Sequence, residues 1–428
     1  MTLAINPKIL TIAIFLATYA LIIIFYHKKM VAVWGAATVL LLLGLLKPAQ
    51  ALSAIDWNVI LLYFGMLLVS EVFLFSKMPD YLATLFAARA KNVGMAMVLI
   101  CLFTGFLSAA IENVAVVLLV APIALSISKR CDLNPVPLFI GMSISANLQG
   151  AATLIGDPPS MLLAGFAKMT FNDFFILEGK PAIFFAVQIG AAVSALVLYL
   201  LFKKYDRKMP VLAKEPFISL VPSVLVLLLI ISLVASSSFS HGIALMTGLL
   251  CSFFGLLSFG WYLMHKRGQD IKKFASALDW QSGVFLMGIF ILVRSLSAAG
   301  LMEDAAQLIL TVAGNNPFIV FLLIVWISVF LSAFIDNIPF LVAMLPVIEI
   351  ITARMGINPY ALYFGLLLGA SIGGNVTPIG ASANIVAMGI LKKQGHHVSF
   401  MEFVRIGLPF TIASVAASSL FVWLIFGM

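Results

Sequence analysis

The sequence predicts an all-α polytopic membrane protein that consists of two inverted repeats, each with five transmembrane helices, one re-entrant helical hairpin and one broken helix. Two observations support this fold class. Hydrophobic residues form 63% of the 428-residue chain and charged residues only 10%, whereas soluble domains carry about 25% charged residues. Apolar runs of spanning length also recur along the whole chain, and they form two similar series.

The first apolar run, at about 9–26, is expected to be a true membrane span. Its basic cluster, His27-Lys28-Lys29, follows the run instead of preceding it, and no A-x-A cleavage site comes after it. A secretory signal peptide has the opposite polarity. The net charge of +8 is concentrated in the loops between the runs, so it indicates membrane topology and no nucleic-acid partner.

The expected spans divide the chain into two repeats joined by a polar linker. In the first repeat, residues 1–203, spans are expected at about 9–26, 31–47, 57–75, 137–168 and 181–203. The linker, residues 204–216, is expected to be cytoplasmic. In the second repeat, residues 217–428, spans are expected at about 217–236, 242–264, 280–298, 360–391 and 404–426. Each repeat also has an amphipathic piece, at 78–91 and 301–312, before a longer apolar segment.

Matching residues recur along the two repeats at a nearly constant offset. Asp56-Trp57 returns as Asp279-Trp280 after 223 positions (279 − 56), and Glu112-Asn113 returns as Asp336-Asn337 after 224 (336 − 112). Further matches at the second offset are Pro122 with Pro346, Asn134-Pro135 with Asn358-Pro359, Gly150 with Gly374, Thr153 with Thr377, and Gly156 with Gly380. A series that stays in register over this length predicts an internal repeat.

The longer apolar segment of each repeat, at about 93–128 and 318–352, is expected to be a re-entrant hairpin. A straight helix over residues 93–128 would measure about 54 Å, whereas the hydrocarbon core is about 30 Å thick. The polar pairs Glu112-Asn113 and Asp336-Asn337 mark the two turns. Because five spans are an odd number, the second repeat must be inverted, and the two tips are expected to meet near the midplane.

Lys and Arg gather in alternate loops, which predicts the orientation of the chain. With both termini outside, the inner loops include Lys28-Lys29, Lys129-Arg130, Lys203-Lys204 and Lys392-Lys393. Cytoplasmic loops carry the excess of Lys and Arg in membrane proteins. The expected location is therefore the inner (plasma) membrane, crossed many times, with the lipid bilayer as a partner.

Three carboxylates are expected inside the membrane, at Glu112, Asp157 and Asp336. A charge at that depth costs several kcal/mol, so an intramembrane acid is by default a functional candidate. These three residues are candidates for proton or cation coupling, because a buried carboxylate with neighbours of like charge can carry a proton or bind a cation directly. The alternative is structural. Asp157 precedes Pro158-Pro159 and could merely cap a half-helix.

The fourth span of each repeat is interrupted by Gly and Pro. The interrupted stretches are Ser143–Ser160, SISANLQGAATLIGDPPS, and Gly369–Asn384, GASIGGNVTPIGASAN. Paired broken spans in two inverted halves are typical of the binding site of a transporter. The candidate ligands there are Asn147, Thr153, Asn375, Thr377 and Asn384. Their hydroxyls and amides could instead satisfy the helix breaks or contacts between helices.

Four stretches carry a likeness to known proteins: SAFIDNIPF at 332–340, AATLIGDPPS at 151–160, IGASANIVAMGI at 379–390 and SFMEFVRIG at 399–407. In them the chain resembles the ion transporter superfamily, in the branch of arsenite permeases, NhaD-type Na⁺/H⁺ antiporters and the melanosomal P protein. The resemblance implies inverted repeats whose hairpins and broken spans move against a scaffold. It also implies a substrate bound by Asn113, Thr153, Asn337 and Thr377, with Gly150 and Gly374 permitting close backbone approach.

The hairpin tips differ from those of the Na⁺-coupled dicarboxylate carriers in that superfamily, which have a Ser-Asn-Thr type of tip. Here the tips read Glu112-Asn113-Val114 and Asp336-Asn337-Ile338. The acid in place of Ser favours a carrier that exchanges protons or cations. We therefore expect a secondary active transporter, first of all a proton-coupled antiporter that exports arsenite or antimonite in arsenical resistance. Na⁺/H⁺ antiport, and symport of a carboxylate or a sulfate-type anion, are the alternatives.

Other functional classes are disfavoured by the motifs that the sequence lacks. It contains no HExxH, GxGD or GxSxG pattern, so neither an enzyme nor a cofactor is expected. Cys101, Cys131 and Cys251 are far apart, so no metal site is expected and arsenite would bind as neutral As(OH)₃. Two offset hairpins suit alternating access better than a continuous channel. The sequence leaves open the solute, the coupling ion, a homodimer and a separate ATPase subunit.

Overall fold

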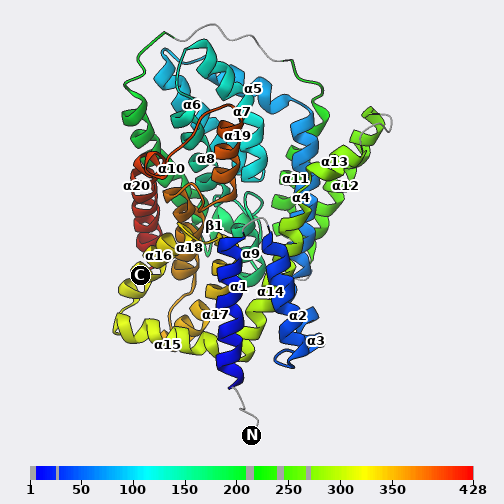
Figure 1. The fold of residues 1–428 in the computed structure, drawn as a ribbon, viewed down its shortest axis with the longest axis vertical. Coiled ribbons are helices and arrows are strands. Elements are labelled where there is room, and N and C mark those ends of the chain that lie inside the picture. The colour runs from blue at the N-terminus through cyan, green and yellow to red at the C-terminus, as the bar shows by residue number, and fades with distance from the viewer. Residues whose placement is uncertain (1–5, 26–27, 209–215, 239–244, 267–270, 428) are drawn as a thin grey trace.

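The computed structural model describes residues 6–25, 28–208, 216–238, 245–266 and 271–427, which fold almost entirely into helices (Figure 1). Eight helices in this part of the chain are long and apolar enough to cross a membrane, or up to nine if a bent pair, Leu301–Ala313 with Pro317–Ser332, counts as one span. The predicted class of polytopic helical membrane protein is confirmed. Most of the expected linker, 209–215, lies outside the described residues.

The first half of the chain begins with α1 (Pro7–Ile24) in the lower part of Figure 1. Its elements are α1 (Pro7–Ile24), α2 (Lys29–Leu42), α3 (Pro48–Ala54), α4 (Trp57–Phe75), α5 (Met78–Ala87), α6 (Val93–Ser108), α7 (Asn113–Arg130), α8 (Val136–Gly150), α9 (Pro158–Ala167), η2 (Asn172–Phe174), β1 (Ile176–Leu177), β2 (Lys180–Pro181) and α10 (Ile183–Phe202). The antiparallel pair of β1 and β2 is a small addition that the sequence did not predict.

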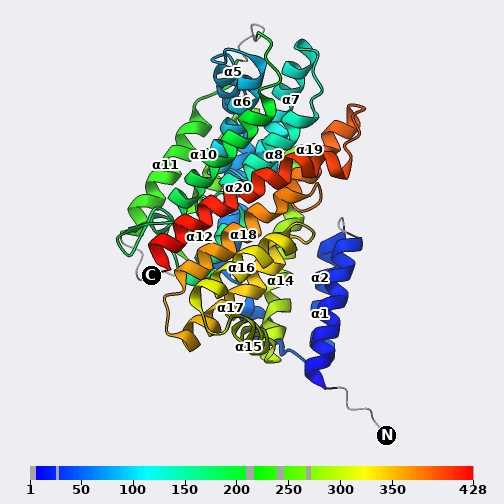
Figure 2. The same cartoon turned by 90° about the vertical axis from the view of Figure 1, so that its left-hand side faces the viewer.

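The second half repeats much of this order. Its elements are α11 (Val221–Ser237), α12 (Met246–Lys266), α13 (Ile271–Ala277), α14 (Trp280–Ala298), α15 (Leu301–Ala313), α16 (Pro317–Ser332), α17 (Asn337–Met355), α18 (Tyr360–Gly373), η3 (Gly374–Val376), α19 (Ser382–Lys393) and α20 (Phe400–Phe426). In Figures 1 and 2 the α6–α7 pair lies in the upper part of the molecule and the α16–α17 pair in the lower part.

The second expected span is shorter than predicted. We expected it at about 31–47, but α2 ends at Leu42. Gly44 follows with φ +69°, a left-handed conformation that suits glycine, and the short helix α3 begins at Pro48. With 14 residues, α2 falls below the length of the eight spanning helices.

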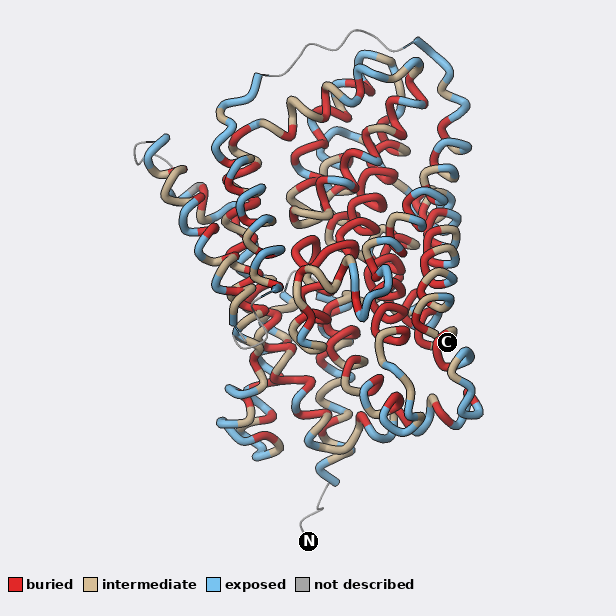
Figure 3. Tube along the Cα trace, turned by 180° about the vertical axis from the view of Figure 1, so that it is seen from behind, coloured by how far each residue is buried: buried red, intermediate tan, exposed pale blue. Residues whose placement is uncertain are grey.

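The two interrupted spans lie in the most buried part of the molecule. Every residue of α8 except Pro137, and every residue of α18 except Tyr360, is buried. Figure 3 shows the same concentration of buried residues in the middle of the trace, with exposed residues at its periphery. A helix that is apolar on all sides belongs in such a core. The breaks that follow α8 and α18 are therefore enclosed by protein, where unwound backbone can persist.

Glycines allow two of the spanning helices, α4 and α12, to pack closely. A Cβ built on Gly255 of α12 would lie 2.7 Å from the carbonyl oxygen of Gly65 on α4, whereas one built on Gly260, five residues further along α12, would meet nothing within 4 Å. Small residues let the backbones of membrane helices approach in this way.

Gly255→Ala is expected to lower the stability of the purified protein by about 1–3 kcal/mol, because the added methyl group forces α4 and α12 apart. Gly260→Ala is the matched control and is expected to be neutral or to stabilise by up to about 1 kcal/mol, since alanine favours the helix. Thermal unfolding in detergent measures both variants. Equal melting temperatures for the two would contradict this packing.

Candidate substrate and ion site

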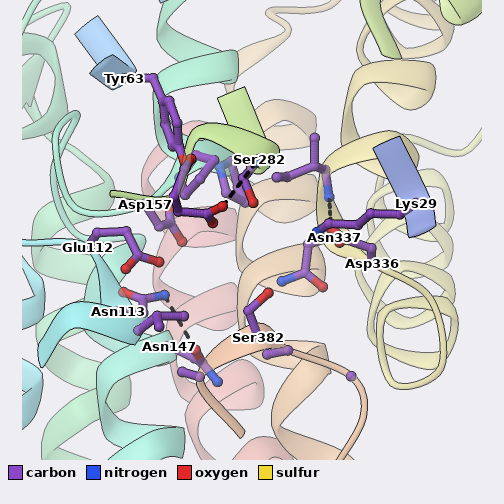
Figure 4. A pocket seen from close by; sticks show the side chains of 18 of the residues that line it. Lys29, Tyr63, Glu112, Asn113, Asn147, Asp157, Ser282, Asp336, Asn337 and Ser382 are labelled. Carbon is purple, nitrogen blue, oxygen red and sulfur yellow. Dashed lines mark hydrogen bonds and ion pairs between the residues drawn. The ribbon is translucent and has the colours of Figure 1, made fainter. Parts of the chain in front are cut away.

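A cavity of about 70 Å³ lies where helices begin inside the protein (Figure 4). Its lining includes the first residues of α7, α9, α14, α17 and α19, together with Lys29 at the start of α2. The polar lining residues are Lys29, Tyr63, Glu112, Asn113, Asn147, Asp157, Asp279, Ser282, Asp336, Asn337 and Ser382. A cavity of this size holds a few water molecules. The two hairpin tips, expected to meet, therefore face one common space.

Four of the helix starts at the cavity are capped by an acid. Glu112 Oε2 accepts a hydrogen bond from Ala115 N at 3.0 Å, and Asp157 Oδ1 accepts one from Ser160 N at 2.9 Å. Asp336 and Asp279 cap α17 and α14 in the same manner. An acid at this position satisfies backbone N–H groups and faces the positive end of the helix dipole. The structural alternative considered for Asp157 thus holds, and the same carboxylates also line the cavity.

The fifth helix that starts at the cavity has no such cap. Residue Ala381 precedes α19 and has no side-chain oxygen that could bind its first N–H groups. By the 224-residue offset, Ala381 corresponds to Asp157 of the first half (381 − 157). The two halves of the cavity are therefore chemically different, with an acid on one side and an uncapped helix start on the other.

Lys29 is the one basic side chain that the described residues contribute to the cavity lining. Its Nζ lies 2.8 Å from Asp336 Oδ2, and the two side chains are only 12% and 10% exposed. We expected Lys29 in an inner loop and Asp336 near the midplane, and these two expectations cannot both hold. Lys29, the first residue of α2, instead reaches the tip of the second hairpin.

A buried set of asparagine side chains joins the two broken spans. Asn147 Nδ2 donates to Asn375 Oδ1 at 2.8 Å and to Asn384 Oδ1 at 3.1 Å. Asn113 Nδ2 donates to Asn147 Oδ1 at 3.4 Å. Asn384 Nδ2 in turn donates to the carbonyl oxygens of Gly374 and Thr377, at the break itself. Because buried amides must be paired, this network fixes the position of Asn147 at the cavity wall.

The two threonines predicted as ligands bind the hairpin backbones instead of facing the central cavity. The hydroxyl of Thr153 donates to the carbonyl oxygen of Ala109, and that of Thr377 to the carbonyl oxygen of Ala333. Both contacts join a broken span to the turn of its hairpin, and they are related by the 224-residue offset. Each hydroxyl thus compensates a helix end, the structural alternative stated above. Direct contact of either threonine with a substrate stays a prediction.

The twelve predicted site residues form two groups, those that line the cavity and those that pack behind its wall. Six of the twelve line the cavity, namely Glu112, Asn113, Asn147, Asp157, Asp336 and Asn337. The others, Gly150, Thr153, Gly374, Asn375, Thr377 and Asn384, lie behind them. At Gly150 a Cβ would collide with the side chain of Asn113, and at Gly374 with the carbonyl oxygen of Gly380. The glycines therefore permit close packing of the hairpin tip and of the break.

Several residues of the cavity were not assigned from the sequence. Asp279 was used only as a marker of the repeat, although it caps α14 and faces the cavity with Ser282. Tyr63 Oη donates to the carbonyl oxygen of Asp279 at 3.4 Å. The signal for Asp279 was present, because an acid that is repeated before Trp at a helix start can be recognised as a cap. No pattern in the sequence indicated the position of Lys29.

Two further cavities flank the hairpins at related positions. One, of about 580 Å³, is lined by Glu71 of α4 and Pro122 of α7. The other, of about 420 Å³, is lined by Arg294 of α14 and Pro346 of α17. In Figure 1 α7 lies in the upper part of the molecule and α17 in the lower part. Glu71 and Arg294 therefore line separate cavities, and the ion pairs found among the described residues do not join them.

These features together define a class of protein. Broken spans that meet hairpin tips at a polar internal cavity, in a chain of apolar helices, are the arrangement of a multi-pass membrane transporter. The family model described as citrate transporter (CitMHS) matches residues 19–356. Because this is most of the chain, the protein belongs to that family, and it is a transporter and no enzyme.

Known relatives agree with this assignment. An uncharacterized transporter of Mycobacterium tuberculosis (strain H37Rv) is 32% identical over 430 residues, which cover 97% of this chain and 98% of the relative. The P protein of Mus musculus is 28% identical over 490 residues, covering 94% of this chain and 58% of that protein. The predicted superfamily and the likeness to the P protein are thus confirmed. In fold, the chain is similar to the YdaH transporter of Alcanivorax borkumensis, with TM-score 0.62, 13% identity and 99% of each chain covered.

Thr153→Val and Thr377→Val are each expected to cost about 1–3 kcal/mol of stability, since each leaves a buried carbonyl oxygen without its donor. Thr311→Val is the matched control, because its hydroxyl bonds within an exposed helix, and it is expected to change stability by less than about 0.5 kcal/mol. Chemical unfolding in detergent compares the three. A large loss for only one of the two buried threonines would contradict their equivalence.

Proposed function

We propose that the protein is a secondary active antiporter that exchanges protons for a small inorganic solute, with arsenite or antimonite as the first candidate. The observation that carries this proposal is the charge of the cavity. Four carboxylates and one ammonium group line it. Four carboxylates in so small a space carry more negative charge than one ammonium group balances, which favours binding of a further proton or cation. The cavity is therefore built to bind and release positive charge.

The size and chemistry of the lining favour a small neutral solute or a cation. Arsenite is neutral As(OH)₃ near pH 7, and its hydroxyls can donate to carboxylate and amide oxygens such as those of Glu112 and Asn147. No cysteine is among the lining residues, so a thiolate complex of arsenic does not form at this site. Na⁺ would be bound by the same oxygens. Flux measurements with each solute distinguish the two.

A second candidate is uptake of a carboxylate such as citrate together with a cation. The family to which the chain belongs is described as citrate transporters. The start of α19, which no side chain caps, offers backbone N–H groups that suit a carboxylate oxygen. A bare tricarboxylate would be repelled by the four acids, so it would have to enter as a cation complex or with protons. It is also larger than the present cavity and requires the hairpin tips to separate.

The proposed mechanism is alternating access between two inverted repeats, residues 1–203 and 217–428. Related contacts in the two halves support the repeat, namely Ser108 with Asn113 and Ser332 with Asn337, and the two threonine contacts at the breaks. The position of the α6–α7 and α16–α17 pairs at opposite ends of the molecule supports the inversion. In this mechanism each hairpin tip closes the cavity toward one side, where the flanking cavity of that side gives access.

The proposed location is the inner (plasma) membrane, with the loops at the α6–α7 end on the cytoplasmic side. This end carries Arg89, Lys91, Lys129 and Arg130, which agrees with the excess of basic residues in cytoplasmic loops. Both termini then lie outside.

The proposal is tested in proteoliposomes with an imposed pH gradient. Arsenite, antimonite, Na⁺ and citrate with Mg²⁺ are offered separately, and uptake is measured with the gradient present and after its collapse. We expect arsenite or antimonite uptake that requires the gradient. Uptake that is indifferent to the gradient would contradict proton coupling. Gradient-driven uptake of Na⁺ alone, or of citrate alone, would replace the first candidate by the corresponding alternative.

Asp157→Asn and Asp279→Asn are expected to reduce gradient-driven uptake about tenfold, because each removes a negative charge from the cavity. Both variants should fold, because asparagine caps a helix as well as aspartate does. Asp56→Asn is the matched control. Asp56 corresponds to Asp279, caps α4 and lies outside the central cavity. Equal loss of uptake in Asp56→Asn and Asp279→Asn would contradict a role for the cavity charge.

A further inference from the structure

The ion pair of Lys29 and Asp336 differs from the ion pair of Lys8 and Asp304. It joins the start of α2 to the tip of the second hairpin across 307 positions, with both side chains almost fully buried. Lys8 and Asp304, which join α1 to α15, are 36% and 60% exposed. The ammonium group of Lys29 also lies 4.7 Å from the centre of the Phe285 ring. Lys29 is thus held on one side by a carboxylate and on another by an aromatic face.

Stability alone does not account for such a pair. Removing two charges from water costs several kcal/mol for each ion, and apolar residues of similar volume often serve as well or better. The pair also lies at the cavity wall, where its charges face three further acids, Glu112, Asp157 and Asp279. The position of the ion pair therefore indicates a functional role in the site.

The position of the ammonium group is the position that a cation would take. Asp336 Oδ1 is bound to the backbone N–H of Ile338, which leaves Oδ2 for a positive partner, and Lys29 Nζ is 2.8 Å from it. Glu112, the corresponding acid of the first hairpin, forms no ion pair within the described part of the chain and has only backbone donors assigned to it. The tip of the second hairpin is therefore paired with a cationic side chain of the protein itself, whereas the tip of the first hairpin, among the described residues, is not.

We propose that Lys29 is a tethered competitor for a metal cation at Asp336. With Lys29 in place, the tip of α17 is neutralised and fastened to the start of α2. A cation that binds Asp336 must displace the ammonium group, which releases the tip from that helix. Lys29 thereby sets the affinity of the second tip for cations and links cation binding to movement of the hairpin. The inference deepens the proposed function, on which it rests for the identity of the site.

The test measures cation binding directly, without transport. Thermal unfolding of the purified protein is followed as Na⁺ or Mg²⁺ replaces choline at constant ionic strength. Lys29→Gln is expected to lower the half-saturating concentration of at least one of these cations tenfold or more relative to the wild type. Lys28→Gln, at the neighbouring exposed lysine, and Lys8→Gln, which breaks the exposed ion pair, are the controls. Both should keep the wild-type response.

Two variants separate competition from a merely structural role. Asp336→Asn is expected to lower the melting temperature, because it leaves Lys29 charged and buried without its partner. The double variant Lys29→Gln/Asp336→Asn is expected to recover the melting temperature while it loses the gained cation response. A folded Lys29→Gln protein with the wild-type cation response would overturn the proposal, and so would a gain that persists in the double variant.

A measurement on the wild-type protein covers the case in which Lys29→Gln does not fold. Hydrogen exchange of the peptides around the start of α2 and the start of α17 is compared with and without a saturating cation. Faster exchange in both peptides supports displacement of Lys29, and unchanged exchange overturns it. The proposed function is judged separately by the flux experiment. Failure of flux with an altered cation response in Lys29→Gln would reject the proposed solutes and keep the role of Lys29.

Discussion

The structure depends on one constraint, which is that helices begin inside an apolar protein, away from water. The first N–H groups of such a helix need acceptors, because no solvent is present to supply them. Acids fill this need at four of the five helix starts around the cavity, including Glu112 and Asp336. The same choice concentrates negative charge in one place. The capping of the helix starts and the capacity to bind protons or cations are therefore consequences of a single arrangement.

The supporting residues make this arrangement rigid. Asn147 connects the break after α8 to the break after α18 through two amide hydrogen bonds, and the threonines fasten each break to its hairpin turn. Movement of a hairpin must then carry its broken span with it, because a buried carbonyl or amide would otherwise lose its partner. The threonine contacts thus make each hairpin and its broken span one connected unit, and Asn147 joins the units of the two halves.

Much of the fold could be predicted from the sequence, because hydropathy and Gly/Pro interruptions act over short distances. The hairpin turns at Glu112 and Asp336 and the breaks near Gly150 and Gly374 follow from local pattern alone. The cavity could be predicted only in part. Which side of a helix start faces a cavity, as with Asp279, depends on packing, and Thr153 was assigned to a ligand role that its hydrogen bond to Ala109 does not require. The contact of Lys29 with Asp336 joins distant segments, and no local pattern encodes it.

The separation of Lys29 from Asp336 has a consequence for the synthesis of the protein. The two residues are 307 positions apart, and at about 5–20 residues per second translation from one to the other takes roughly 15–60 seconds. During that time Lys29 has already been made while its carboxylate partner does not yet exist. A lone lysine at the depth of the cavity is costly in a membrane. The start of α2 can therefore take its final place only after α17 has emerged, which makes docking of the first helices a late step of assembly.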